Sequence, residues 1–383
     1  MSRTFANTSN GIHLGLAFDY HAHDAVAVGR NISYIFGGYF VDWKLGIDPR
    51  VRHIDSYIPF DLDAYPQAYR GHSLGDWKAR HPGWIVYRCD RRTPAYYGSG
   101  STNVPLDFSN PAVRAYEIRE VERTFAQGAS GVAFDNFTFA NIESRCGVYR
   151  NDSWTSLGYP GRWQVNTKLA NDMVSWLSSM RGALRRRFPT NTVAVNMDFA
   201  ATPLKYVQEV APDVDMFLDE GGFTDFGTQN ITGVAWQREV NTLEYLNDQG
   251  KAFDVNGIVD APSDKQVTPA QINWVLANYL LVKGAHSYTY IYAGDHVSQK
   301  RSPSGYGTFY NRPQYHVAIG HPTSARVGAD GVQLRRYSGG LVIVNPSGLR
   351  TFSVPLGGAY RDMFGHSYTS VTLPPASGLV LLN

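Results

Sequence analysis

Short, almost wholly apolar runs recur through the first three quarters of the chain, and stretches with helical spacing separate most of them. Strands of a parallel sheet carry such runs, because helices cover them and leave neither face in water. The eight runs that we predict as strands are His13–Phe18, Ile32–Gly38, Trp84–Cys89, Gly131–Asp135, Thr192–Asn196, Asp215–Asp219, Phe253–Ile258 and Ser287–Tyr292. Strands and helices in this alternation predict an α/β protein, a (β/α)₈ TIM barrel.

Five stretches between these runs have the length and the end signals of helices. Ser109 and Thr268 are residue types that cap helix N-termini, and each is followed shortly by a proline. The predicted helices are Pro111–Gln127, Arg162–Arg187, Leu204–Val210, Trp236–Asp248 and Pro269–Lys283. The region between residues 38 and 84 is less regular, and Val51–Ile58 is an alternative strand there, so the assignment of the early barrel strands stays open.

The pattern of the sequence changes after Ala293. Residues 294–324 are rich in Gly, Ser, Pro and His, and short strands separated by turn residues follow them. These strands are Gly331–Tyr337, Leu341–Asn345, Arg350–Pro355, Tyr360–Asp362, Ser370–Leu373 and Gly378–Leu382. We therefore expect two domains, the barrel with its connecting segment over residues 1–324 and a small antiparallel β-sandwich over residues 325–383.

Composition and charge narrow the class of partner. The formal net charge is +2, and the one basic run, Arg185–Arg187, falls at a predicted helix end where cations favour the helix dipole. Nucleic acid is therefore not expected as a partner. No stretch of about 18 apolar residues predicts a membrane span, and the first residues lack the apolar core of a signal peptide. The 24 Tyr and 8 Trp include rings that could stack on sugars.

Two acids follow predicted strands at the same rim of the barrel. Asp135 ends its strand, and Glu220 comes directly after Asp219 at the end of another. The carboxyl ends of barrel strands carry the catalytic groups, and glycoside hydrolysis needs a pair of carboxyl groups. Asp219 competes with Glu220, but side chains alternate along a strand, so only one of the two faces the mouth. We favour Glu220.

Other polar and aromatic residues near the strand ends are candidates for contacts with substrate. The polar candidates are Asp19, Arg88, Asp90, Asn136 and Asn196. Arg88 and Asp90 could form an ion pair that orients the site. The candidates for stacking on sugar rings are Trp163, Trp236, Tyr290 and Tyr292, although each could instead pack in the core.

The pair His21 and His23 raises a metal-dependent hydrolase as an alternative. Such a barrel needs further histidine ligands from later strands, and no histidine stands between His81 and His286. We therefore expect no metal and no organic cofactor. Cys89 and Cys146 follow neighbouring predicted strands, and either a disulfide or two free thiols fits that placement.

The segment Leu106–Phe137 (LDFSNPAVRAYEIREVERTFAQGASGVAFDNF) resembles hypothetical glycosyl-hydrolase barrels. In those proteins an LDF–NP–V segment precedes a strand similar to DGVFLDN. The stretch Gly339–Pro346 is similar to the small β-sandwich that follows many glycosidase barrels. The resemblance implies a glycosidase similar to the α-galactosidase-like clan, with Asp135 as nucleophile and Glu220 as acid/base. The clan commonly has Asp at the position of Glu220.

The sequence thus predicts hydrolysis of O-glycosidic bonds in a poly- or oligosaccharide, with retention of configuration as the favoured outcome. The alternative is a barrel that binds carbohydrate without cleaving it. A barrel enzyme that acts on another bond, such as an amide, is a third possibility.

Overall fold

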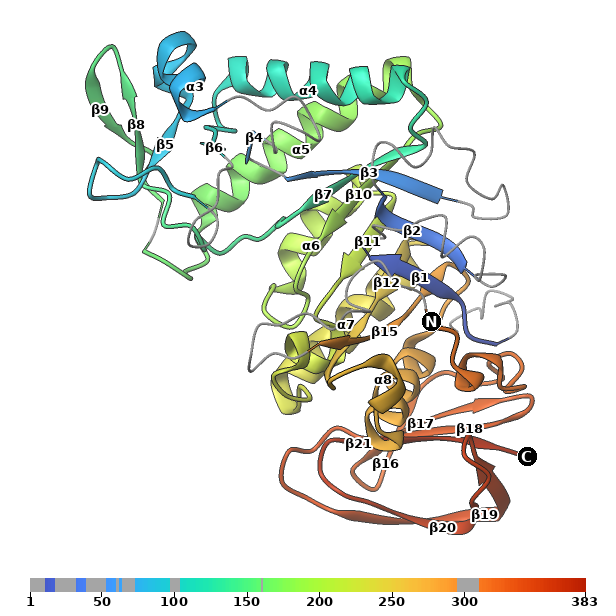
Figure 1. Cartoon of the computed structure of the whole chain (residues 1–383). Helices are drawn as coiled ribbons and strands as arrows, with labels where there is room; N and C mark the ends of the chain where they lie inside the picture. The colour runs from blue at the N-terminus through green and yellow to red at the C-terminus, as the bar shows by residue number, and fades with distance from the viewer. Residues whose placement is uncertain are drawn as a thin grey trace.

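A single eight-stranded sheet organises the first three quarters of the molecule (Figure 1). The structure is a computed structural model that describes residues 11–17, 32–38, 53–59, 62–63, 73–96, 104–159, 161–294 and 310–383. In the sheet every neighbouring pair of strands is parallel. Its strands, in spatial order, are β1 (Leu14–Ala17), β2 (Ile32–Gly38), β3 (His53–Pro59), β7 (Gly131–Asp135), β10 (Thr192–Asn196), β11 (Met216–Asp219), β12 (Ala252–Val255) and β14 (Ser287–Tyr288).

The first and last strands of this sheet also meet each other. Leu14 and Thr289 form a parallel bridge. The Gly15 N–H donates to the Thr289 carbonyl at 3.3 Å, and the Thr289 N–H donates to the His13 carbonyl at 3.0 Å. Strands of a closed barrel pair in this way. The last two strands then continue, after a break, as β13 (Gly257–Asp260) and β15 (Ile291–Gly294), which also pair in parallel.

Helices cover one face of the sheet, and their positions agree with the prediction to within five residues at each end. They are α4 (Pro111–Ala126), α5 (Thr167–Arg187), α6 (Leu204–Val210), α7 (Gly233–Asp248) and α8 (Pro269–Val282). Thr268 caps α8 as predicted, but the cap of α4 is Asn110, whose side chain accepts from the Ala112 N–H, and not Ser109. The Phe134 ring of β7 packs edge-on against Trp176 of α5 at 4.8 Å, which identifies the helix-covered face.

The predicted third strand, Trp84–Cys89, does not belong to the main sheet. Residues Val86–Tyr87 form β5, which pairs antiparallel with β8 (Gly147–Arg150) in a small sheet completed by β9 (Ser153–Ser156). The alternative strand, Val51–Ile58, corresponds to β3 and occupies the third position. Trp84–Cys89 is largely apolar, whereas β3 includes His53, Asp55 and Ser56, so apolar character alone does not identify the strand that joins the main sheet. Further short elements are β4 (Leu62–Asp63), α3 (Leu74–Arg80) and β6 (Val104–Pro105).

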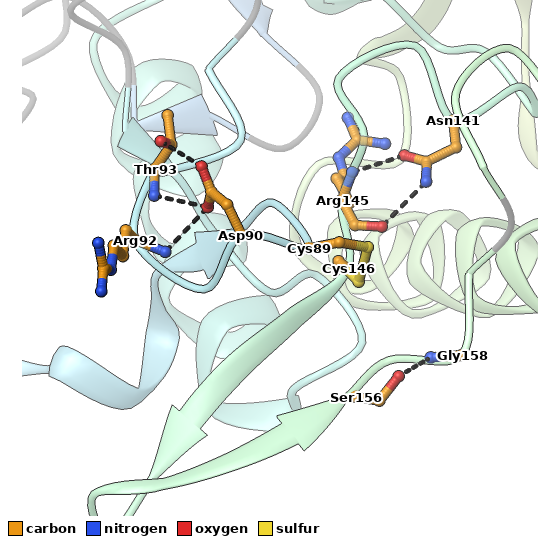
Figure 2. Close-up of a disulfide and its surroundings, with 9 residues drawn as sticks. All are labelled: Cys89, Asp90, Arg92, Thr93, Asn141, Arg145, Cys146, Ser156 and Gly158. Carbon is orange, nitrogen blue, oxygen red and sulfur yellow. Dashed lines mark hydrogen bonds between the residues drawn. A yellow bond between two sulfur atoms is a disulfide. The ribbon is translucent and has the colours of Figure 1, made fainter.

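A disulfide links this small sheet to the loop after β7. Cys89 and Cys146 are bonded, with their Cα atoms 5.1 Å apart, and Figure 2 shows the bond beside Asn141 and Arg145. The structure therefore selects the bridged alternative that the sequence left open. Within the described part of the chain, no helix combines the length and the apolar character that crossing a membrane requires.

The last quarter forms one six-stranded antiparallel sheet. Its spatial order is β16 (Val327–Ala329), β17 (Val332–Tyr337), β18 (Gly340–Asn345), β21 (Ser377–Leu382), β19 (Phe352–Asp362) and β20 (Ser367–Leu373). Two strands predicted separately, Arg350–Pro355 and Tyr360–Asp362, are parts of β19, with an irregular register between them. Apolar side chains from β17, β18, β19, β20 and β21 form a hydrophobic cluster separate from the main core.

The opposite face of this sheet packs against α8. Val342, Val344 and Val380 join the core of the main sheet, and the Arg335 guanidinium donates to the carbonyls of Leu280 and Lys283 at the end of α8. A cation at that place satisfies carbonyls that the helix itself leaves unpaired. Because both sides of α8 are covered, the helix is apolar all round.

Candidate active site

The two predicted acids lie on the inner face of the sheet, opposite the helices. Asp135 ends β7 directly after Phe134, whose ring points to the helix side. Successive side chains of a strand point to opposite faces, so Asp135 points inward. In β11, Asp219 points outward and Glu220 inward by the same rule. Asp135 is buried, with 9% of its surface exposed, and Glu220 is half-buried.

A single amide nitrogen holds both acids. Asn196, the last residue of β10, donates from Nδ2 to Asp135 Oδ1 at 2.7 Å and to Glu220 Oε2 at 2.9 Å. Because both oxygens lie at these distances from one atom, they cannot be more than about 5.6 Å apart. The strand between the two acid-bearing strands therefore brings the predicted pair together.

The chain leaves the site through a tight turn after Asp135. Asn136 has φ 57°, and its carbonyl accepts from the Thr138 N–H at 2.8 Å. Asparagine tolerates this left-handed conformation better than most residues. The Phe137 N–H then donates to the Asn196 carbonyl at 3.0 Å, so the backbone of the turn is tied to the residue that links the acids.

Asp219 lies on the helix-covered side and binds backbone N–H groups. It is 1% exposed and accepts from the Phe199 N–H at 2.7 Å and the Gly222 N–H at 2.6 Å. These bonds tie the loops after β10 and β11 to each other. Burial, and then the charge of Asp198, raise the pKa of Asp219 to about 7.

Glu239 of α7 lies behind Asp219 and is fully buried. Burial first, and then the charges of Asp219 and Asp198, raise the pKa of Glu239 well above its ordinary value. Two buried acids this close to one another do not both ionise near neutral pH. The pair therefore keeps a proton that the unfolded chain would release.

Two buried polar residues, one in β12 and one directly after it, were not predicted from the sequence. Asp254 is buried on the inner face, where a Cβ on Gly15 would lie 2.3 Å from its Oδ2, and burial raises the pKa of Asp254 to about 8. The Asn256 side chain is 1% exposed. The available signal was an acid inside the apolar run Phe253–Ile258, because carboxyl groups rarely stand in a fully buried strand.

Arg88 and Asp90 lie just after β5, at the small sheet, and each has other partners in place of the predicted ion pair. Asp90 is exposed and accepts from the Arg92 and Thr93 N–H groups and the Thr93 hydroxyl, which lower its pKa to about 2. Arg88 donates from Nη2 to the Tyr96 carbonyl at 3.3 Å. Neither residue ends a strand of the main sheet, which corrects the reason for selecting them. Asp19, like His21 and His23, lies outside the described residues.

The aromatic residues predicted to stack on sugars are mostly buried. Trp236 of α7 is 1% exposed and donates to Asn278 Oδ1, so its ring presents no open face and that prediction is corrected. Tyr290 is fully buried, with its hydroxyl at the Tyr310 backbone, and Tyr292 donates to and accepts from Ala17. Trp163 is the exception, because 64% of its surface is exposed.

No group of three or more His, Cys, Asp or Glu side chains that could hold a metal ion occurs in the part of the chain that the structure describes. The described residues bring two carboxyl groups and an amide together at the inner rim. Such a set can bind hydroxyl groups, transfer a proton and attack an electrophilic carbon.

Comparison with known proteins identifies the fold alone. No known family model matches the chain, and no curated protein matches it. Among solved structures, Eubacterium rectale Amy13B is 10% identical, with 98% of this chain and 97% of that chain covered and a TM-score of 0.51. An inactive MutB double mutant with bound isomaltulose is also 10% identical, with coverages of 97% and 98% and a TM-score of 0.51.

The α-glucosyl transfer enzyme XgtA is 12% identical, with coverages of 98% and 92% and a TM-score of 0.51. The chain thus has a glycoside hydrolase-like fold. These matches do not single out the α-galactosidase-like clan that the sequence resemblance suggested.

Proposed function

We propose that this protein is a glycoside hydrolase that cleaves O-glycosidic bonds of a poly- or oligosaccharide with retention of configuration. Its site lies at the mouth of a (β/α)₈ barrel within residues 1–324, and residues 325–383 form an attached β-sandwich. Carbohydrate is the substrate, and the reaction uses no metal or organic cofactor. The fold shared with carbohydrate-active enzymes supports this proposal.

The observation that carries the proposal is the amide of Asn196 between the two acids. It limits the separation of the bonded oxygens to about 5.6 Å. Retaining glycosidases hold their carboxyl groups about 5–5.5 Å apart, whereas inverting enzymes need about 6.5–9.5 Å to admit a water molecule. The spacing therefore supports retention.

The roles of the acids follow from this arrangement. In the first step Asp135 attacks the anomeric carbon, the bond to the leaving oxygen breaks, and Glu220 gives its proton to that oxygen. The product is a glycosyl ester of Asp135. In the second step Glu220 takes a proton from water, the water oxygen attacks the anomeric carbon, and the Asp135 carboxylate leaves.

Asn196 contributes to the proton placement. Its Nδ2 donates to Glu220 Oε2, so that oxygen must accept and the proton of the acid form resides on Oε1. The same nitrogen also donates to Asp135 Oδ1, so one amide orients both acids. Asn196 is thus a positioning residue for both steps.

Product release from a panel of purified polysaccharides tests the function. The panel contains α-glucans, β-glucans, galactans and hexosamine polymers, and the proteins are wild type, Asp135→Asn and Glu220→Gln. We expect wild type to release sugar from one class, and each variant to lose at least about 100-fold of that rate. The anomer released first, followed by NMR, should match the anomer of the substrate.

The other outcomes are distinct. Full activity in both variants would show that the site lies elsewhere. An inverted first product would contradict the retaining assignment. No release from the whole panel, by folded protein that still binds one glycan, would favour the carbohydrate-binding barrel that cleaves nothing.

A further inference from the structure

The loop that begins at Asp135 ends in an exposed tryptophan. Trp163 lies between β9 and α5, and 64% of its surface is in contact with solvent. The other large hydrophobic residues that are strongly exposed in the described ranges are aliphatic: Val165, Val234, Val327 and Leu349. The part of an indole ring that stays in water after folding contributes no hydrophobic stabilisation, so the fold gains little from this ring.

The backbone at Trp163 is also unfavourable for such a residue. The Gln164 N–H donates to the Gly161 carbonyl at 3.2 Å, which closes a turn with Trp163 at its third position. There Trp163 has φ 65°. This conformation favours Gly or Asn, and a bulky side chain adopts it with strain. Strained residues of this kind gather at ligand sites.

Backbone hydrogen bonds connect this turn to Asn141. The Trp163 N–H donates to the Asn141 carbonyl at 3.2 Å, and the Asn141 N–H donates to the Gln164 carbonyl at 3.2 Å. The buried Asn141 side chain in turn accepts from the Arg145 N–H at 2.8 Å and donates to the Arg145 carbonyl at 2.9 Å. The disulfide of Cys146 follows directly, as Figure 2 shows. The ring is therefore displayed on a rigid support.

The ring also has a neighbour suited to hydroxyl groups. The Arg162 guanidinium lies 5.2 Å from the centre of the Trp163 ring, and its Nε donates to the Ile142 carbonyl at 3.2 Å. An aromatic face beside a fixed hydrogen-bond donor suits a sugar ring, which has an apolar face and a polar edge. Since 64% of the tryptophan remains exposed, the guanidinium leaves room for such a ring.

The support is close to the proposed catalytic acids along the chain. Asn141 is six residues beyond Asp135, so the two Cα atoms are at most about 22 Å apart. A glycan of a few residues covers that distance.

We infer that Trp163 is a sugar-binding platform, outside the carboxyl pair, which holds a ring of a long glycan while another part of that chain lies at the acids. The inference rests on the proposed glycosidase function and adds that the natural substrate is a polymer. A platform of this kind lowers KM for long chains and leaves short substrates unaffected.

Affinity electrophoresis and kinetics test this together. Native gels contain soluble starch, hydroxyethylcellulose, galactan or chitosan, and the proteins are wild type, Trp163→Ala, Trp163→Gly and the control Leu349→Ala. Leu349 is 92% exposed and lies in the C-terminal sheet region, so its variant removes exposed apolar surface elsewhere. For any polysaccharide that wild type hydrolyses, kcat and KM are measured on the polymer and on its trisaccharide.

We expect one gel to retard wild type and Leu349→Ala, and to retard neither Trp163 variant. On the polymer the Trp163 variants should show about a tenfold higher KM, with kcat on the trisaccharide unchanged. Trp163→Gly relieves the strained turn, so its Tm should equal or exceed that of wild type, which separates lost binding from lost folding.

Trp163 variants that migrate and hydrolyse like wild type would overturn the inference, as would wild type that no gel retards. Retardation that depends on Trp163, with no hydrolysis of any polymer, would support the platform and contradict the proposed hydrolase. Hydrolysis of a polymer by the Trp163 variants with the wild-type KM would support the proposed hydrolase and contradict the platform.

Discussion

The inner and outer sides of the strand ends hold acids in opposite surroundings. On the inner side, Asp135 and Glu220 share one amide donor, and Glu220 is half-buried. On the helix-covered side, Asp219 and Glu239 are buried, and Asp219 is tied to backbone N–H groups. Asp219 and Glu220 are adjacent in the chain, yet the alternation of a strand gives one a structural task and the other access to substrate.

This difference shows that the position of a carboxyl group relative to the sheet decides what it can do. A raised pKa alone would have pointed to Asp219, Glu239 or Asp254, all of which are buried. A group that transfers a proton to substrate must reach it. Accessibility therefore separates Glu220 from the buried acids behind it, and the shared Asn196 donor connects Asp135 to Glu220.

The largest expected effect separates the two neighbours directly. Glu220→Gln should lower kcat by about 100- to 10,000-fold, because it removes the proton donor. Asp219→Asn keeps the donor but loses one acceptor for a backbone N–H, so it should cost about 1–3 kcal/mol of unfolding free energy and lower kcat only about tenfold. Urea unfolding and initial rates measure both. An Asp219→Asn enzyme as inactive as Glu220→Gln would reverse our assignment.

The link between the acids is the next target. Asn196→Ala removes the donor to both carboxyl groups and lets them repel each other, so kcat should fall about 10- to 100-fold. Asn196→Asp places a third carboxyl group there and should be less active still. A matched control is Asn191→Ala, which removes a donor to the Ala129 carbonyl away from the rim. Equal losses of kcat in Asn191→Ala and Asn196→Ala would exclude a specific role for Asn196.

The buried pair on the helix side should make stability depend on pH. Glu239 and Asp219 have raised pKa values, so the folded protein keeps protons that the unfolded chain releases above about pH 4. Their contribution to stability is present at low pH and is lost as pH rises toward the folded pKa, about 7 for Asp219. Glu239→Gln removes one of these titrating groups. The free energy of unfolding should therefore fall less steeply between pH 5 and 7 than in wild type, by about 1.4 kcal/mol per pH unit. Urea titrations of both proteins at several pH values measure the slope, and equal slopes would contradict this account.

The smallest effect is expected at Asp90, an exposed carboxyl group at the small sheet. Its pKa is lowered to about 2, so it does not titrate between pH 5 and 7. Asp90→Asn should therefore leave the pH slope of stability unchanged and lower the rate of hydrolysis by less than twofold, measured beside Glu239→Gln. A large loss of hydrolysis in this variant would mean that the small sheet contributes to the site.

The sequence by itself determined much of the main sheet and the opposite facing of two neighbouring acids. The strands β7 and β10 have the predicted bounds, because each is a short apolar run with a polar residue at its end. Alternation along β11 selected Glu220 over Asp219, and the structure places these side chains on the two faces as expected. Both results rest on local periodicity, which a strand imposes wherever it lies.

Only the tertiary structure decided which runs pair with each other and which side chains are covered. Trp84–Cys89 is the more apolar of the two runs, yet β3 joins the main sheet. Trp236 and Trp163 are the same residue type, but one is buried and the other exposed. The bonds from Asn196 to two acids join residues 61 and 24 positions apart. Strand partners, burial and side-chain bonds depend on segments distant in the chain, so no local pattern contains them.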